Sequence, residues 1–375
     1  MAAQENLQRA AVLVAPSKNP EFNVQLVPRP VPGPNEVLVR LSLTSICGSD
    51  YGLASGELGE TRTILGHEGV GRVVELGSGV PAIDPSVQVG QRVGVGWARD
   101  ACGACGWCTT LAQDGETRCA ERVTSGRVVD GTFAEYTVVP ARYLCRIPAA
   151  YDGVPDEHVA PVCCGGVTAY KAIKGCGVVP GRWIAVSGAG GGVGALAVAF
   201  ARAMGYRVVG VDAGADKGRF CLEQGAEHFV DITALAAGED PGPEVRRLTG
   251  TEGVDAVIVT SGAAAAYQAA FSMLGPFGTL MCVGLPPADR LVHFHPAMCV
   301  AFGWQVKGSA VGTRRDILEA LEFVRRGLVT PRTEWGRLED MTTLLENVVR
   351  GKILGKYVIK LDGEDSSKTT EAPAS

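Results

Sequence analysis

Four cysteines lie within eighteen residues of the chain, three of them at every third position. Thiolates with this spacing on a short loop can converge on one tetrahedral Zn²⁺. A site closed by four sulfurs has no position for a substrate, so we expect it to hold the loop at 97–122 in shape. The alternative is a reactive or disulfide-bonded loop. The pattern favours a structural zinc bound by Cys102, Cys105, Cys108 and Cys119.

A second group of metal-binding residue types lies in three other segments, which read ICGSD, LGHEGVG and APVCCGG. Two cysteines and one histidine would leave the fourth tetrahedral position of a zinc ion open to a substrate oxygen. The two adjacent cysteines of the last segment are both candidates for the third ligand. The residues of interest are Cys47, Ser49, Asp50, His67, Glu68, Cys163 and Cys164.

Residues 183–212 carry the strongest cofactor signal, because an apolar strand, a glycine-rich turn, a helix and a second strand follow in order. Small residues at 189, 191 and 194 fit the dinucleotide fingerprint, with Ala189 in place of its first glycine. Asp212 ends the second strand, where a carboxylate binds ribose hydroxyls and repels a 2′-phosphate, so NAD is favoured over NADP. We expect the pyrophosphate to contact Gly188, Gly190, Gly191, Gly192, Val193 and Gly194.

The segments between these motifs predict two kinds of structure. Up to about residue 160, short apolar runs (37–43, 70–76, 134–140 and 143–148) are separated by Gly and Pro, which is typical of an irregular β domain. Helical segments (168–176, 194–205 and 265–274) then alternate with apolar strands (206–212, 254–262 and 278–285), which indicates a doubly wound parallel sheet. Helices at 314–327 and 341–351 and a strand at 355–361 could return to the first domain.

The composition of the 375-residue chain, with 46% hydrophobic and 20% charged residues, is that of a globular protein. A net charge of −5 argues against a nucleic-acid or anionic-membrane partner. We find no signal-peptide pattern and no apolar run of eighteen residues, so we expect a cytoplasmic protein. In that compartment the twelve cysteines are metal ligands and buried thiols rather than disulfides. Residues 362–375 have the composition of a disordered tail.

From about residue 10 to residue 361 the chain resembles the zinc-dependent medium-chain alcohol dehydrogenases, most closely the fungal, yeast-type branch. The matching segments are GHEGVGRVV, the spaced cysteines, PVCCGGVTAYKAIK, the glycine-rich stretch ending at residue 212, and GKILGKYVIK. The resemblance implies an α/β fold in which a GroES-like irregular β-barrel catalytic domain (1–160 and 310–361) contains an inserted Rossmann domain (161–309). It also implies two zinc ions per subunit, NAD(H), a small alcohol or aldehyde substrate, and a homotetramer or homodimer.

The resemblance also implies roles for individual residues. The catalytic zinc would be bound by Cys47, His67 and Cys164, since Cys164 to Thr168 match the family pattern. Asp50 would orient the His67 ring, Ser49 would contact the alcohol, and Glu68 would be the acid behind the zinc or an ordinary buried ion-pair partner. The pocket would include Leu58 and Trp97. Further contacts to the cofactor are expected from Lys217, Gly284, Ser309 and Lys356.

Three departures from the yeast-type pattern bear on the substrate. Gly52 stands where the family has a relay histidine, so the proton would leave through water or another group such as Tyr51. Gly48 replaces a pyrophosphate-binding His or Arg, as in polyol-type relatives, and Leu58 replaces a pocket tryptophan. We therefore expect an alcohol–aldehyde or alcohol–ketone oxidoreductase whose substrate is bulkier than ethanol, as in secondary metabolism. The alternatives are a polyol-type (sorbitol or butanediol) dehydrogenase and a non-catalytic zinc- and NAD-binding relative.

Overall fold

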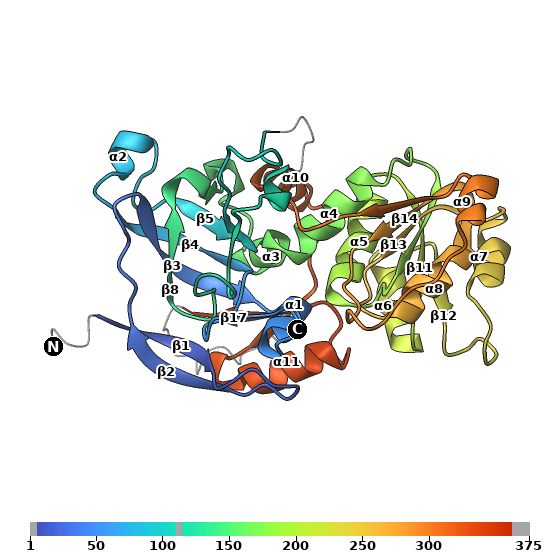
Figure 1. Ribbon diagram of the computed structural model, residues 1–375, viewed down its shortest axis with the longest axis horizontal. Coiled ribbons are helices and arrows are strands. Elements are labelled where there is room, and N and C mark those ends of the chain that lie inside the picture. The colour runs from blue at the N-terminus through green and yellow to red at the C-terminus, as the bar shows by residue number, and fades with distance from the viewer. Residues whose placement is uncertain (1–5, 110–114, 362–375) are drawn as a thin grey trace, which may run out of the picture.

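The computed structural model describes residues 6–109 and 115–361 and forms two lobes side by side (Figure 1). The tail predicted at 362–375 lies outside the described residues. One lobe is built on a six-stranded sheet and the other on a seven-stranded sheet. Among the described residues, no helix is both long and apolar enough to cross a bilayer.

The six-stranded sheet is parallel throughout and has the strand order β12-β11-β10-β13-β14-β15. Its central strands are almost wholly apolar because helices cover both faces. The order reverses between β10 and β13, and the carboxyl ends of the strands at such a switch point are where open α/β sheets generally bind their ligands. The strands are β10 (Trp183–Ser187), β11 (Arg207–Asp212), β12 (His228–Asp231), β13 (Val254–Val259), β14 (Leu274–Cys282) and β15 (Gln305–Gly308).

Helices connect these strands and bury small or apolar side chains against the sheet. Helix α5 directly follows the glycine-rich turn and buries eight of its twelve residues, including Phe200. The core on this side includes Ile184 and Val186 from β10 and Ile258 from β13. The helices of this lobe are α4 (Gly165–Gly175), α5 (Gly192–Ala203), α6 (Ala215–Glu223), α7 (Gly242–Thr249), α8 (Ala264–Met273) and α9 (Pro296–Phe302).

The seven-stranded sheet has the order β16-β17-β3-β4-β5-β9, and β8 also pairs with β3. Strand β17 pairs antiparallel with β3 through Val358 and Ser45, so the end of the described chain returns to the first lobe as expected. The strands are β3 (Glu36–Ser45), β4 (Gly69–Leu76), β5 (Arg92–Val95), β8 (Tyr136–Pro140), β9 (Cys145–Arg146), β16 (Thr333–Gly336) and β17 (Lys356–Lys360). This arrangement is the GroES-like part of the fold.

Smaller elements complete the first lobe. Two further pairs of strands are β1 (Leu7–Leu13) with β2 (Phe22–Pro28), and β6 (Ala98–Asp100) with β7 (Val123–Thr124). The helices are α1 (Gly48–Ala54), α2 (Val80–Ile83), α3 (Asp156–Val159), α10 (Arg314–Arg325) and α11 (Met341–Val349). Short 3₁₀ turns lie at 115–118, 141–143, 149–151, 160–163 and 338–340.

Most expected elements are present, and one is much shorter than expected. The run at 143–148 forms only the two-residue strand β9, because a 3₁₀ turn precedes it and Pro148, which has no N–H to donate, follows it. Each strand of the two large sheets lies on the expected side of the boundaries at 160 and 309. The domain boundaries themselves stay predictions.

Candidate active site

Helix α1 and the loop before β4 bring the first two candidate metal ligands together. Cys47 directly precedes α1, and its N–H donates to Oδ2 of Asp50, 2.9 Å away. The other oxygen, Oδ1, accepts from the N–H of Gly66 at 3.2 Å. Gly66 has φ +92°, and a Cβ there would lie 2.5 Å from the Phe133 ring. Asp50 therefore fixes the position of the loop that carries His67.

His67 is fully buried and its ring is held by one of its two nitrogens. Nδ1 lies 2.9 Å from Oδ1 of Asp50, so Nε2 is the nitrogen turned toward Ser49, whose Oγ is 3.2 Å away. The Trp97 ring packs edge-on against the imidazole at 5.0 Å. Burial alone would lower the pKa of His67, but the Asp50 carboxylate and Cys47 outweigh it and raise that pKa well above its ordinary value. This arrangement presents Nε2 as a ligand.

Four ligand atoms converge next to this ring. One atom each from Cys47, His67, Glu68 and Cys164 lies within 4.8 Å of all the others, and all four side chains are buried. Ser49 Oγ is 3.2 Å from Cys47 Sγ, so its hydroxyl borders the cluster. A hydrogen bond from Cys164 holds the pKa of Cys47 well below its ordinary value. Two sulfurs and an imidazole nitrogen in this arrangement fit a tetrahedral zinc with one further position.

The structure places the two adjacent cysteines in different surroundings. Cys163 lies outside the four-residue cluster, and its Sγ is 3.6 Å from both Gly69 O and Val159 O. Burial raises the pKa of the Cys163 thiol well above its ordinary value. Cys164 alone of the two faces Cys47 and His67. The geometry therefore supports the ligand set that the family resemblance implies.

Glu68, the one carboxylate of this four-residue cluster, is contacted by three neighbours. Its carboxylate accepts from Lys356 Nζ at 2.7 Å and from the Gly165 N–H at 3.0 Å, and it also contacts the Ser45 hydroxyl. Burial raises the pKa of Glu68 above its ordinary value. Ser45 was not predictable as part of the site, because one serine in an apolar strand carries no motif. Both interpretations of Glu68 therefore apply, since it lies near the metal ligands and forms a buried ion pair.

Lys356 was expected to contact the pyrophosphate, and in the structure it forms a buried ion pair. Its side chain is only 4% exposed and its ammonium is paired with Glu68. The stem of the side chain passes the glycine-rich turn, since a Cβ on Gly192 would lie 2.8 Å from Lys356 Cδ. Lys356 thus connects the metal cluster to the start of α5. The pyrophosphate contact stays a prediction.

The four cysteines of the loop also converge. The Sγ atoms of Cys102 and Cys119 are 3.6 Å apart, and the pairs Cys102–Cys108 and Cys105–Cys119 are each separated by 4.0 Å. Zn–S bonds of about 2.3 Å in a tetrahedron place the sulfurs about 3.8 Å apart, so the spacing fits zinc. Backbone N–H donors, chiefly that of Cys108, lower the pKa of Cys105 to about 6. Burial raises the pKa of Cys108 to about 12, so the backbone favours a thiolate at Cys105 but not at every ligand position.

The glycine-rich turn lies at the carboxyl end of β10 and leads into α5. Gly188 has φ +82°, and a Cβ on Gly194 would lie 2.0 Å from Gly188 O, so both positions require glycine. Asp212 accepts from the Gly190 N–H at 2.8 Å and pairs with Lys217 Nζ at 2.9 Å. The N-terminus of α5 presents N–H groups that no helical carbonyl uses. This corner can hold a pyrophosphate and the adjacent ribose.

Two further candidates lie on the same edge of the sheet. The N–H of Gly284 donates to Val259 O and that of Ser309 to Cys282 O, each at 2.9 Å. Both residues follow the ends of parallel strands, β14 and β15, where a bound nicotinamide would extend. The Ser309 hydroxyl is buried and makes no hydrogen bond within the described structure.

The expected substrate pocket shows how the departures from the family pattern are accommodated. Leu58 packs over Gly52, because a Cβ on Gly52 would lie 2.9 Å from Leu58 Cγ. The Tyr51 hydroxyl donates to Lys18 O at 3.1 Å in an exposed position, so it does not continue a proton path from Ser49. A Cβ on Gly48 would meet open space. A larger pyrophosphate-binding side chain would therefore fit at position 48.

Comparisons with known proteins agree with this geometry. Residues 192–326 match the family described as zinc-binding dehydrogenase, and residues 33–149 match the alcohol dehydrogenase GroES-like domain. The chain is 39% identical to alcohol dehydrogenase 2 of Emericella nidulans, over 88% of this chain and 92% of that protein. It is 40% identical to an alcohol dehydrogenase of Geobacillus stearothermophilus, over 91% and 96% of the two chains.

Solved structures show the same fold. An acetophenone reductase from Geotrichum candidum in complex with NAD superposes with a TM-score of 0.80 at 25% identity and covers 95% of this chain and 97% of that chain. A cinnamyl alcohol dehydrogenase from Sorghum bicolor has a TM-score of 0.80 at 25% identity and covers 96% and 100%. The fold and site define a GroES-like, zinc-binding dehydrogenase.

Within that class, the chain belongs to the zinc-dependent medium-chain alcohol dehydrogenases. It is an enzyme, a zinc-binding alcohol dehydrogenase that acts on a small-molecule substrate. The similarity to the Emericella protein is compatible with the expected position near the fungal branch.

Proposed function

We propose that this enzyme interconverts an alcohol bulkier than ethanol and the corresponding aldehyde or ketone. The observation that carries the proposal is the buried cluster of Cys47, His67 and Cys164 with the Ser49 hydroxyl at its border. Cys47, His67 and Cys164 would hold a Zn²⁺ that would polarise a substrate oxygen, and the glycine-rich turn would hold the NAD that would accept the hydride. The chain's own groups bind, orient and shield these partners.

Each residue near the cluster then has a proposed task. Asp50 holds the His67 ring so that Nε2 faces the metal position. Ser49 Oγ accepts the proton of the alcohol while its own hydroxyl proton passes to water, since the Tyr51 hydroxyl is engaged with Lys18. Glu68 and Lys356 form a neutral buried pair behind the cluster and maintain its separation from solvent.

The pocket supports the proposed size of the substrate. Leu58 is smaller than tryptophan and is drawn toward α1 by its contact with Gly52. Its backbone N–H donates to Gly52 O at 2.9 Å, which anchors the residue there. Space that a tryptophan would take is thus available to the substrate, and the Trp97 ring packs beside His67.

Absorbance at 340 nm tests the proposal directly. The purified enzyme is mixed with NADH and a graded panel of aliphatic, branched and aromatic aldehydes and ketones, and with NAD and the matching alcohols. We expect kcat/KM to rise with substrate size above acetaldehyde or ethanol, and we expect a zinc chelator to abolish turnover. A strong preference for ethanol over every larger alcohol would contradict the proposal.

A polyol-type dehydrogenase is the second candidate, and Gly48 favours it. The residue at this position of the polyol-type pattern is also glycine, and position 48 faces open space. Sorbitol and 2,3-butanediol belong in the same substrate panel. Turnover of these diols with kcat/KM above that of all simple alcohols would select this alternative.

We also propose that the enzyme is a homo-oligomer with a dimer as its smallest unit. Strand β15 is an edge strand with unpaired backbone groups, and an edge can pair with its own copy across a two-fold axis. Large apolar side chains are exposed along and beside this edge. They are Phe277, Leu285, Leu291, Phe294, Met298, Val300, Phe302 and Val306.

Light scattering after size exclusion tests the assembly. Val306→Glu places a charge on the edge strand and should lower the measured mass to that of one subunit, or raise the dissociation constant at least tenfold. Val31→Glu, at a residue 82% exposed on the other lobe, is the matched control. An unchanged mass for Val306→Glu would contradict pairing through β15.

A cytoplasmic location is proposed as well, because a reducing compartment keeps the ligand thiols unoxidised.

A further inference from the structure

The four-cysteine loop ends in a short 3₁₀ turn that contacts the segment leaving the Rossmann sheet. We call residues 116–118 the loop foot and residues 308–314 the return segment, which joins β15 to α10. Arg118 Nη2 donates to Gly308 O at 3.1 Å. At the other end, Glu116 Oε1 accepts from the Arg314 N–H at 3.1 Å. The loop foot therefore contacts both ends of the return segment.

A third contact fixes the middle of the return segment. Lys171 Nζ, on α4, donates to Ala310 O at 3.2 Å and to Thr117 Oγ1 at 3.3 Å, so it joins the return segment to the loop foot. Cys119 follows the loop foot directly and is one of the four clustered cysteines. A metal bound there would fix the position of the loop foot through the chain.

Val311 lies between these contacts in an unfavourable backbone conformation. Its φ is +36°, and a β-branched residue rarely adopts positive φ. The next residue is equally constrained, since a Cβ on Gly312 would lie 2.2 Å from Val167 Cγ2 on α4. Strained backbone of this kind persists only where surrounding contacts impose it, and it concentrates at ligand-binding positions.

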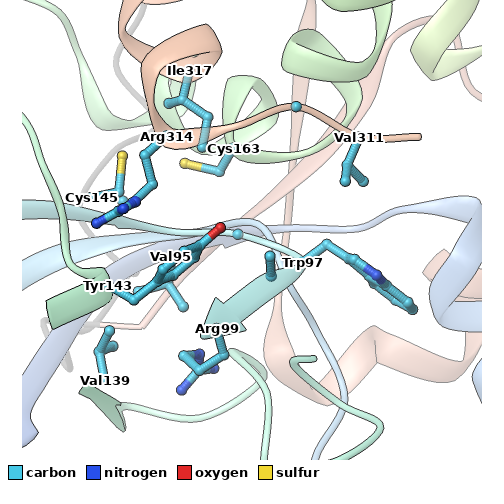
Figure 2. Close-up of a pocket in the computed structure, with 14 residues that line it drawn as sticks. Val95, Trp97, Arg99, Val139, Tyr143, Cys145, Cys163, Val311, Arg314 and Ile317 are labelled. Carbon is cyan, nitrogen blue, oxygen red and sulfur yellow. The ribbon is translucent and has the colours of Figure 1, made fainter. Parts of the chain in front are cut away.

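The return segment lies between the two halves of the proposed active site. It follows the carboxyl end of β15, on the edge where a dinucleotide binds. On its other side, Val311 and Trp97 line a cavity of about 20 Å³, roughly the space for one water molecule (Figure 2). Trp97 in turn packs against His67. A shift of Val311 would therefore reach both the cofactor and the metal cluster.

We propose that the four-cysteine loop positions the return segment, and that Glu116 and Arg118 thereby set the affinity for NAD(H). The inference rests on the proposed NAD site. It assigns the loop a task in cofactor binding in addition to local stability. Glu116 and Arg118 are positioning residues, because their side chains act on the return segment through Gly308 and Arg314 and belong neither to the catalytic cluster nor to the glycine-rich turn.

The test compares five variants of the full-length, zinc-loaded enzyme, of which the fifth is the conservative Arg118→Lys. Arg118→Ala removes the contact to Gly308 O, and Glu116→Gln removes the charge that faces Arg314. Arg72→Ala is the matched control for the first, since Arg72 donates to Gly90 O at 2.9 Å on the same lobe, away from the return segment. Glu121→Gln is the control for the second, at an exposed position of the same loop. Zinc content, Tm, NADH fluorescence titration, kcat and KM for NAD are measured for each.

Arg118→Ala should weaken NADH binding about fivefold, the usual effect of one lost hydrogen bond, and raise KM for NAD similarly. Its zinc content should stay at two ions per subunit, and Arg118→Lys should restore part of the affinity. Both controls should bind NADH as the wild-type enzyme does. If Arg118→Ala and Glu116→Gln lower only Tm and leave NADH affinity unchanged, the inference is wrong. Absence of NADH binding or turnover in the wild-type enzyme would instead overturn the proposed function.

Discussion

Leu58 occupies the space above Gly52. A Cβ added to Gly52 would lie 2.9 Å from both Cγ and Cδ1 of Leu58, and the Leu58 N–H donates to Gly52 O. Two departures from the yeast-type pattern, one at the relay position and one in the expected pocket, are therefore a single packing feature. A side chain at 52 and a leucine at 58 compete for the same volume.

Gly52→Ala should push Leu58 away from α1 and into the proposed pocket. Overpacking costs about 1–3 kcal/mol, which a gain in helix propensity of about 1 kcal/mol partly offsets. We therefore expect a small change in Tm and a several-fold rise in KM for the bulkiest substrates. Steady-state kinetics over the substrate panel measures it. The double variant with Leu58→Ala should recover the KM values, and failure to recover them would refute the coupling.

Asp50→Asn should weaken the catalytic metal site while the fold is retained. Asp50 is fully buried and its carboxylate lies 2.9 Å from His67 Nδ1. Loss of a carboxylate that orients a ligand typically costs about 10- to 100-fold in metal affinity. Competition with a chromogenic chelator measures the affinity of each of the two zinc ions. Only the catalytic ion should be released more readily, and equal release from wild type and variant would contradict the role of Asp50.

Asp212→Asn should reduce the preference for NAD over NADP. Asp212 pairs with Lys217 Nζ at 2.9 Å, and removal of its charge also frees that ammonium for a phosphate. We expect KM for NAD to rise about tenfold, the effect of losing a hydrogen bond to a charged group, while KM for NADP falls. Asp255→Asn is the control. Asp255 pairs with Arg182 at the amino end of β13, whereas Asp212 lies at the carboxyl end of β11. Unchanged cofactor selectivity would argue against the assignment.

Asp316 should make the free energy of unfolding depend on pH under acidic conditions. Burial would raise its pKa, but hydrogen bonds from the Thr313 N–H and hydroxyl and from Lys174 outweigh burial and lower that pKa below its ordinary value of 3.8. A carboxylate with a depressed pKa stabilises the fold above its unfolded pKa, and that contribution is lost as pH falls through the folded pKa.

Asp316→Asn, which removes the carboxylate of the Thr313–Asp316 capping box at the start of α10, should therefore lower Tm by about 2–4 °C at pH 7. The difference from wild type should shrink as pH falls below about 4. Calorimetry at pH 7, 4 and 3 measures both effects. A difference in Tm that stayed constant over this range would show that the charge of Asp316 contributes nothing.

Motifs with a fixed spacing were predictable from the sequence. The cysteines at 102–119 and the glycines at 188–194 each lie on one short segment, so local chain geometry brings them together. The alternation of strands and helices after residue 160 likewise predicted the parallel sheet, because both periodicities are local. Cys47, His67 and Cys164 are distant in sequence, and only the family resemblance joined them.

Contacts that depend on tertiary packing were not predictable. Lys356 and Glu68 form an ion pair although they are 288 residues apart in the sequence, and no pattern in either segment indicates the pair. Ser45 and Arg118 are ordinary polar residues whose roles follow only from what packs against them. The sequence left open a proton path through Tyr51. Only the structure shows that the Tyr51 hydroxyl donates to Lys18 O.

Metal analysis of His67→Ala tests the central claim most directly. The variant and the wild-type enzyme are purified in parallel, their zinc content is measured by elemental analysis, and alcohol oxidation is followed at 340 nm. We predict two zinc ions per subunit in the wild-type enzyme and one in the variant, which should still bind NADH but show no turnover. Full zinc content or undiminished turnover in His67→Ala would contradict the proposed metal site.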